Sequence, residues 1–398
     1  DRSPAVLPAC PPARLPACPP ARLPSYPHLR NALPMLPVSL VPRVCVRFPV
    51  CSSIVVALIF ATAPAARVAA ADELNALVWC NHTDEAFIEP FEQAHGVTVN
   101  LKEFEGTGAA LSIIEQSRPG DWDVLIIDGV DVPRLVEAGV LGEIPTDTLP
   151  LDDMWPEVLL EDKNVVDGKT YGVTELFGYN TIAYDRAAVD PEDMQDMRNL
   201  WNGKYEGRIA VYDWALPMIG LVGMGLGKET ASLGIEDMPE IRETLAALGE
   251  NAAQFTDVVA SQTALATGEV DILFGGGEWL TAVLSEEMPN LDWTLPAEGG
   301  LLWTMSATRF ADTERPELAL KFIEHIMSPE GQAALATSSC YWSTPANRKA
   351  GELLSEEQRR ALRWGDQADY LARSQLYPEP GGELEEAMED AWIEMQQR

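Results

Sequence analysis

The sequence predicts an α/β protein of two lobes, and three observations support this prediction. From residue 74 onward, short apolar segments typical of buried strands alternate with amphipathic helical segments. Two longer extended stretches, residues 171–184 and 301–307, carry no helix signal and are suited to cross between lobes. A second series of strands and helices lies between these stretches, so each lobe would be built from separate parts of the chain.

The first series of strands and helices covers residues 74–138. Gly96 and Gly139 directly follow two amphipathic segments, and glycine favours the end of a helix because it adopts left-handed backbone angles. In open α/β sheets ligands bind at the carboxyl ends of the strands, so the residues just after a strand are candidate site residues. We expect strands at residues 74–79, 97–104 and 123–127, and helices at residues 84–95, 109–116 and 132–138.

The second series lies between the two crossings, and more helices follow the second crossing. The tail from Ser355 onward is helical and acidic. We expect strands at residues 208–212 and 270–274, and helices at residues 217–226, 238–248, 262–267, 317–327 and 329–338. We assign residues 72–176 and 304–352 to lobe 1 and residues 177–303 and 353–398 to lobe 2.

The first 71 residues differ in composition from the rest. Residues 1–34 are proline-rich, nearly repeat the unit LPACPPAR, and read as a disordered lead or as residues translated upstream of the true start at Met35. Residues 35–71 combine arginines, the short apolar run at 54–60 and small residues up to Ala71, the order of a secretory signal peptide. The run is shorter than the roughly 20 residues of a membrane span. We expect cleavage after Ala70 or Ala71 and export of the remainder.

The chain after residue 71 is strongly acidic. Of 28 basic and 62 acidic residues, seven basic and one acidic residue precede residue 72, which leaves 21 bases, 61 acids and a net charge of −40. This charge argues against binding to nucleic acid or to anionic membranes. Because the acids are spread along the chain, they are typical of a solvated surface suited to high salt. The alternative interpretation is that the negative charge creates an electrostatic field that attracts a cationic ligand.

Two cysteines lie after residue 71, Cys80 and Cys340, and they are 260 positions apart. No metal-ligand spacing is present. In an oxidising compartment the two thiols could form one disulfide. Two buried free thiols are the alternative.

Sequence signatures of enzymes are mostly absent. The chain has no GxSxG, HExxH, P-loop or GxGxxG motif after a strand, and the histidines after residue 71 (His82, His95 and His325) are not helical neighbours. We therefore expect no catalytic residues, no metal and no cofactor. The run Gly275–Gly277 could donate backbone N–H groups to an anion. A strand-to-helix turn that needs positive φ also explains the run, and we favour this explanation.

Aromatic and acidic side chains gather near the predicted strand ends and crossings. Aromatic rings hold alkyl chains and the faces of cations, while carboxylates bind amines. For any single tryptophan, packing in the core is the alternative. We predict a ligand-binding set of Trp79, His82, Asp84, Glu85, Asp128, Glu175, Phe177, Tyr179, Asp213, Trp214, Glu278, Trp279, Trp303 and Tyr341.

Seven segments together resemble the bacterial spermidine/putrescine-binding proteins of ABC importers. They occur in order across residues 74–350 as LNALVWCNHTDE, WDVLIIDGVDVPRLVEAGVL, YGVTELFGYNTIAYD, LWNGKYEGRIAVYDWA, TGEVDILFGGGEW, PAEGGLLWTMS and CYWSTPANRKAGELLS. The resemblance implies the type II periplasmic binding protein fold, with a ligand cleft between two lobes that close about two crossover strands.

The ligand residues of that family carry over only in part. The family's Asn-Trp-Thr-Glu-Tyr corresponds to residues 81–85, where His82 and Glu85 replace two aromatic residues. Its Ser-Thr-Tyr corresponds to residues 128–130, which begin with Asp128. Its Asp-Asp-x-x-Glu aligns with residues 213–217 and keeps Asp213 without the glutamate, and the tryptophan of its Ile-Trp-Asn-Gly falls near Gly276. Trp303 is kept, but the family's aspartate two residues later is Met305.

The resemblance implies a periplasmic substrate-binding component of an ABC transporter rather than an enzyme. We expect a monomer that binds a polyamine such as putrescine or spermidine and presents it to a membrane permease. Within the same fold, the alternative is another solute, such as an amino-acid derivative, an opine or an organic anion. A transferase that attaches a cofactor to a cysteine is a further alternative, and the signal peptide and the net charge of −40 argue against it.

Overall fold

A mixed sheet runs through the part of the chain that the computed structural model describes, residues 72–397. The predicted lead (residues 1–34) and signal peptide (residues 35–71) lie outside these residues. Along the sheet, in order of neighbours, the strands are β2 (Val97–Glu103), β1 (Asp72–Val78), β3 (Val124–Asp128), β12 (Leu301–Phe310), β7 (Gly172–Asp185), β10 (Ile272–Gly276), β8 (Ile209–Tyr212) and β9 (Ala252–Thr256).

Three parallel strands form one end of this sheet. β1 pairs with both β2 and β3, and every residue of β3 is buried, as expected for a strand covered on both faces. The helix α1 (Glu85–His95) follows β1, and its cap is local: the Asp84 carboxylate accepts a hydrogen bond from the Ala86 N–H, and Gly96 ends the helix with φ of 66°. The loops after β1, β2 and β3 therefore share one edge of the sheet.

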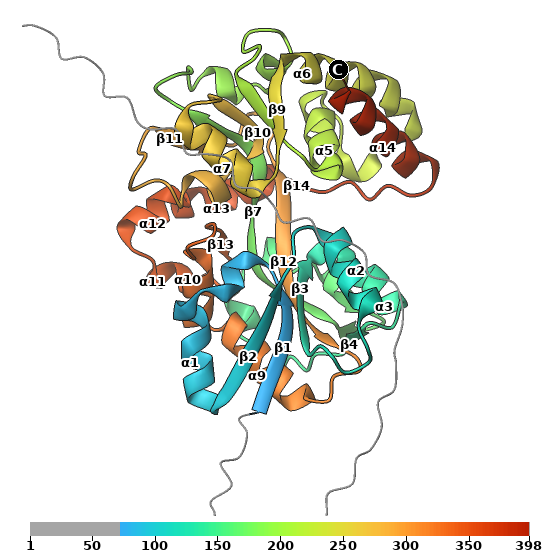
Figure 1. Cartoon of the computed structure of the whole chain (residues 1–398), viewed down its shortest axis with the longest axis vertical. Coiled ribbons are helices and arrows are strands. Elements are labelled where there is room, and N and C mark those ends of the chain that lie inside the picture. The colour runs from blue at the N-terminus through green and yellow to red at the C-terminus, as the bar shows by residue number, and fades with distance from the viewer. Residues whose placement is uncertain (1–71, 398) are drawn as a thin grey trace, which may run out of the picture. The chain divides into compact units, whose positions relative to one another are not determined.

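Two long strands connect the two ends of the sheet. β7 is 14 residues long and buried at every position except its last. β12 pairs antiparallel with β7 from Leu301↔Asn180 to Thr308↔Gly172. On its other side β12 pairs antiparallel with β3, from Met305↔Asp128 to Arg309↔Val124. β7 continues beyond the region shared with β12 and pairs there with β10. Figure 1 shows β7 and β12 passing between two groups of helices and strands, which confirms the predicted two-lobed α/β fold with two crossover strands.

The second group is built on β8, β9 and β10, which run parallel to one another. α5 (Ala215–Gly225) is buried along nearly its whole length, and α6 (Met238–Asn251) and α14 (Glu383–Gln396) pack beside it. β9 is absent from the predicted elements, because its sequence AAQFT has weak strand preference. α7 (Val258–Thr267) begins four residues earlier than predicted, at the cap provided by Asp257.

The remaining elements are helices, four short strands that pair with β7 or β12, and two short strands that pair with each other. Within residues 72–397 no helix has the length and apolar character needed to cross a membrane. The helices are α2 (Thr107–Gln116), α3 (Val132–Glu137), α4 (Glu161–Asn164), α8 (Glu278–Thr281), α9 (Pro316–Met327), α10 (Pro329–Ala336), α11 (Ala350–Leu353), α12 (Glu356–Ala361) and α13 (Gln367–Arg373). The short strands are β4 (Leu141–Gly142), β5 (Val165–Val166), β6 (Lys169–Thr170), β11 (Leu291–Thr294), β13 (Thr344–Pro345) and β14 (Gln375–Leu376).

Candidate ligand-binding pocket

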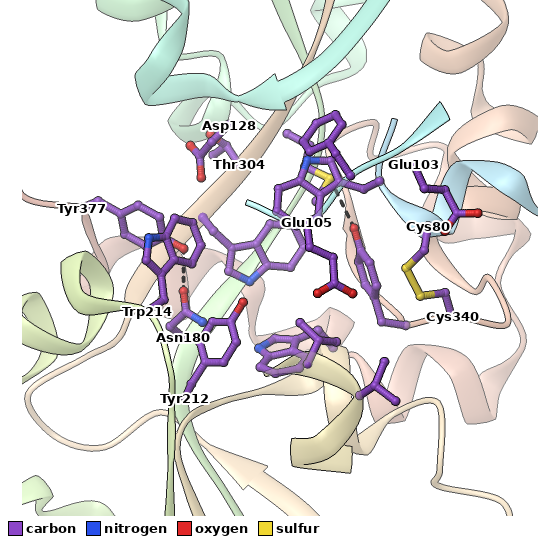
Figure 2. Close-up of a pocket in the computed structure, with 18 residues that line it drawn as sticks. Cys80, Glu103, Glu105, Asp128, Asn180, Tyr212, Trp214, Thr304, Cys340 and Tyr377 are labelled. Atoms are coloured by element: carbon purple, nitrogen blue, oxygen red, sulfur yellow. Dashed lines mark hydrogen bonds between the residues drawn. A yellow bond between two sulfur atoms is a disulfide. The ribbon is translucent and has the colours of Figure 1, made fainter. Parts of the chain in front are cut away.

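A pocket of about 540 Å³ lies where the carboxyl ends of β1, β2, β3 and β8 meet the middle of β7 and β12 (Figure 2). Both groups of strands contribute to its walls, as expected for a cleft between lobes. The lining residues are Trp79, Cys80, Glu103, Phe104, Glu105, Asp128, Asn180, Tyr212, Trp214, Val258, Val259, Trp279, Trp303, Thr304, Met305, Cys340, Tyr341 and Tyr377.

Aromatic rings make up much of the pocket wall. The ring centroids of Trp79 and Phe104 are 5.3 Å apart, and those of Trp214 and Tyr377 are 5.4 Å apart. Tyr212 lies 5.5 Å from Trp279, again measured between ring centroids. Such tilted and edge-on pairs hold one another in place and leave ring faces for a ligand. The wall can therefore enclose an alkyl chain or the face of a cation.

The charge of the lining is entirely negative. Asp128, Glu103 and Glu105 contribute carboxylates, and none of the lining residues is a lysine, arginine or histidine. Asp128 is 7% exposed, and its carboxylate accepts a hydrogen bond from the Val130 N–H. Burial, and then the nearby charge of Asp131, raise the pKa of Asp128 well above its usual range. A cationic group beside Asp128 would offset this cost of burying a charge.

A disulfide forms part of the pocket wall. Cys80 follows β1, Cys340 precedes Tyr341, and the two Cα atoms are 6.1 Å apart. Of the two alternatives that the sequence allows, the structure has the disulfide. Because Tyr341 is adjacent to Cys340, the crosslink ties the segment that carries this ring to the end of β1.

The Tyr341 hydroxyl joins the pocket lining to a buried network behind it. It donates to Asn81 Oδ1 over 2.9 Å, and the same oxygen lies 2.9 Å from His82 Nδ1. His82 Nε2 lies 2.7 Å from Glu175 Oε1, with both side chains fully buried. His82 and Glu175, predicted as ligand-binding residues, thus contact each other and hold Tyr341 through Asn81.

A second network fixes the opposite wall. The Tyr377 hydroxyl donates to Asn180 Oδ1 over 2.6 Å, and Asn180 Nδ2 donates to the Gly275 carbonyl over 3.0 Å. Gly275 has φ of 92°, and a Cβ atom there would lie 2.4 Å from the Met218 Cε atom. Glycine is therefore required at position 275 by the left-handed backbone near the end of β10 and by the close packing of Met218.

Six of the predicted ligand-binding residues line the pocket: Trp79, Asp128, Trp214, Trp279, Trp303 and Tyr341. The other eight lie outside the pocket lining, either buried in the core or nearer the surface. Besides the His82–Glu175 pair, Phe177 and Tyr179 are buried in the core, where the Tyr179 hydroxyl donates to Gln367. Glu278 is buried and accepts from the Tyr179 N–H.

The other three of these eight lie nearer the surface. Asp84 caps α1 and also accepts a hydrogen bond from the Ser339 N–H. Glu85 is exposed at the start of α1. Asp213, the family's second-lobe aspartate, accepts from Trp392 Nε1 and Gln396 Nε2 on α14. The C-terminal helix thus occupies the carboxylate that the resemblance assigns to the ligand.

The pocket also contains residues that the sequence analysis missed. Phe104, Glu105 and Tyr212 end or follow predicted strands, so the strand-end rule that selected Trp79 applies to them as well. Tyr377 carried no such signal, because its position depends on the pairing of β14 with β12, which links distant segments. The other missed lining residues are Cys80, Glu103, Asn180, Val258, Val259, Thr304, Met305 and Cys340.

Comparison with known proteins agrees with the geometry of the pocket. The model of the family described as bacterial extracellular solute-binding protein matches residues 86–359. The putrescine/agmatine-binding protein of Pseudomonas aeruginosa is 25% identical over 316 residues, covering 75% of this chain and 85% of that protein. The spermidine/putrescine-binding periplasmic protein of Escherichia coli is 23% identical over 293 residues, covering 72% of this chain and 82% of that protein.

Solved structures show the same fold. The spermidine/putrescine ABC transporter substrate-binding protein of Streptococcus pneumoniae has a TM-score of 0.70 at 19% identity, covering 82% of this chain and 99% of that one. A binding protein of A. tumefaciens in complex with glucopine has a TM-score of 0.64 at 18% identity, covering 82% and 99%. The resemblance found in the sequence is confirmed.

Proposed function

We propose, from the premise that the chain belongs to the bacterial extracellular solute-binding protein family, that it binds a small organic cation for uptake. The ligand we favour is a polyamine such as putrescine or spermidine. It occupies the aromatic pocket, and the closed protein presents it to the membrane permease of an ABC importer. No covalent bond is made or broken.

The observation that carries this proposal is the composition of the pocket wall. Eight aromatic residues and three carboxylates line it, and no basic side chain does. An organic anion would need a positive partner to replace its hydration, and the lining offers none. A flexible alkyl chain with ammonium ends fits both the aromatic surface and the negative charge.

Titration calorimetry of the purified protein with putrescine and spermidine tests the proposal. We expect a dissociation constant in the micromolar range, about −8 kcal/mol, and a preference of at least tenfold over glutamate and succinate. Tighter binding of either dicarboxylic acid would contradict it.

Capture of the ligand requires closure of the two lobes. We propose that residues 72–176 with 304–352 and residues 177–303 with 353–398 move as the two bodies, about hinges near Phe177 and Trp303. Both residues lie within the long crossing strands. Small-angle X-ray scattering should then give a smaller radius of gyration with saturating putrescine. An unchanged radius with bound ligand would rule closure out.

Export and assembly follow from the same proposal. The relative of Escherichia coli is named a periplasmic protein, and we propose that residues 35–71 direct this chain to the periplasm, where it acts as a monomer. Fractionation of the producing cells tests the location, and size-exclusion chromatography with light scattering tests the mass. Recovery in the cytosol with residues 35–71 still attached would overturn the export part.

The same tests also distinguish two alternative functions, the binding of an opine and a transferase reaction. Structural neighbours are described in complex with glucopine and with agropinic acid, and an opine is therefore included in the ligand screen. A transferase with a cofactor on a cysteine needs a free thiol, but Cys80 and Cys340 are joined to each other. A mass spectrum with a covalent adduct on either residue would revive that alternative.

A further inference from the structure

Glu105 carries an unpartnered carboxylate in the pocket. It lies two residues after the end of β2 and precedes Gly106, the N-cap residue of α2, which has φ of 76°. No hydrogen bond or ion pair joins the Glu105 side chain to any other residue within 72–397, and it does not cap α2. Figure 2 shows its carboxylate directed into the middle of the pocket. No contact within the described part of the protein therefore accounts for a carboxylate at this position, which leaves it available to a ligand.

Glu105 and Tyr212 lie on opposite sides of the pocket (Figure 2). Glu105 follows β2, whereas Tyr212 ends β8 in the other group of strands. Burial is the main cause that raises the pKa of Tyr212, and the negative charge of Glu105 is the next. The carboxylate therefore acts across the cleft, where closure of the lobes would remove more of its surrounding water.

The interior end of the pocket has its own acceptors. Asp128 is buried there, and Figure 2 shows Thr304 beside it. Thr304 is 1% exposed, and its Oγ1 atom has no hydrogen-bond partner within the described residues. A buried hydroxyl without a partner costs free energy, so a ligand group that donates to it is favoured. An ammonium can donate to Thr304 and Asp128 together, since it has several N–H groups.

We propose that Glu105 is a specificity-determining residue that binds the second ammonium of a diamine whose first ammonium lies at Asp128 and Thr304. The inference rests on the proposed function and goes further, because a second carboxylate at Glu105 would select ligands with two separated positive charges. Aromatic rings enclose the alkyl chain between the two ends. The length of that chain, and not only its charge, then decides which diamine fits.

Glu103 does not share this role. It also borders the pocket, but Figure 2 shows its carboxylate near Cys80 and directed away from that of Glu105. A single acidic residue at the correct position, rather than the general negative charge of the loop, is therefore the feature to be tested. Glu115, exposed on α2 and outside the pocket lining, offers a matched change of charge on the adjacent element.

The test compares wild type, Glu105→Gln, Glu105→Asp and Glu115→Gln by titration calorimetry with diamines of three to six carbons. Wild type should show one preferred length. Glu105→Gln should weaken the preferred diamine about tenfold, as expected for loss of a charge-assisted hydrogen bond, and flatten the dependence on length. Glu105→Asp withdraws the carboxylate by one methylene, so the preferred diamine should become longer. Glu115→Gln should stay within about twofold of wild type.

The outcomes separate the inference from the proposed function. If wild type binds no diamine, the proposed function fails and the inference fails with it. If wild type binds diamines and Glu105→Gln binds them equally well, the inference alone is overturned. The same holds if Glu105→Asp keeps the wild-type length preference. Because Glu105 is exposed and unpartnered, all variants should unfold at the wild-type temperature, and a thermal melt of each sample checks this.

Discussion

The imidazole of His82 and the carboxylate of Glu175 lie 2.7 Å apart and are both fully buried, one following β1 and the other within β7. Removing one member of such a pair leaves a polar group buried without its partner. We expect Glu175→Ala to lower the free energy of unfolding by about 3 kcal/mol. Equilibrium unfolding in urea measures the difference.

Glu85→Ala is the matched control for this prediction. Glu85 belongs to the same predicted ligand set but is exposed at the start of α1, so its loss should change the free energy of unfolding by less than about 0.5 kcal/mol. Equal effects of the two substitutions would show that the His82–Glu175 pair contributes little to stability.

The disulfide between Cys80 and Cys340 should stabilise the fold and the pocket together. It closes a loop of 260 residues, and loops of this length restrict the unfolded chain strongly. The free energy of unfolding of the double variant Cys80→Ser, Cys340→Ser should be about 2–5 kcal/mol lower than that of wild type. It should also bind putrescine more weakly, because the segment that carries Tyr341 loses its link to β1. Reductant should weaken wild type in the same way and leave the double variant unchanged; sensitivity of both would point to another cause.

The strands and crossings could be predicted because their signals are local. Residues 123–127 form a short apolar run bounded by polar residues, and residues 171–184 form a long extended stretch without a helix signal. Both patterns appear as β3 and β7 in the structure. β9 and the start of α7 were harder to predict, because AAQFT has no strong preference and the Asp257 cap is a single side chain.

The pocket could be predicted only in part, because position after a strand does not determine where a side chain points. Trp79 and Asp128 follow strands and line the pocket, while Asp213 also follows a strand and is held by Trp392 and Gln396 of the C-terminal helix. That competing contact joins residues about 180 positions apart, which no local pattern reveals. Glu278 was selected as a ligand residue for its charge, yet its carboxylate binds the backbone of Tyr179.

Glu278 predicts a dependence of stability on pH. Burial raises the pKa of Glu278 in the folded protein to about 8, from the ordinary glutamate value of 4.5. Between these two values the folded protein keeps the proton and the unfolded chain releases it. The free energy of unfolding should therefore fall by roughly 1.4 kcal/mol for each pH unit as pH rises from about 4.5 to 8, and this contribution should level off above pH 8. Glu278→Gln keeps an acceptor for the Tyr179 N–H and should remove this part of the slope in urea titrations. An unchanged slope would assign it to other groups.

Asp128 predicts that ligand affinity increases with pH. Because burial and the charge of Asp131 raise the pKa of Asp128 well above its usual range, this carboxyl takes up a proton at a higher pH than a solvated aspartate does. An ammonium binds the ionised form, so lowering the pH makes the ligand compete with a proton. Calorimetric affinity for putrescine should therefore rise with pH over the range in which putrescine stays mostly a dication. Asp128→Asn should bind more weakly with little dependence on pH. Asp131→Asn should instead move the rise to lower pH, because removal of the neighbouring charge makes Asp128 easier to ionise. The same rise in Asp128→Asn as in wild type would show that a different group controls it.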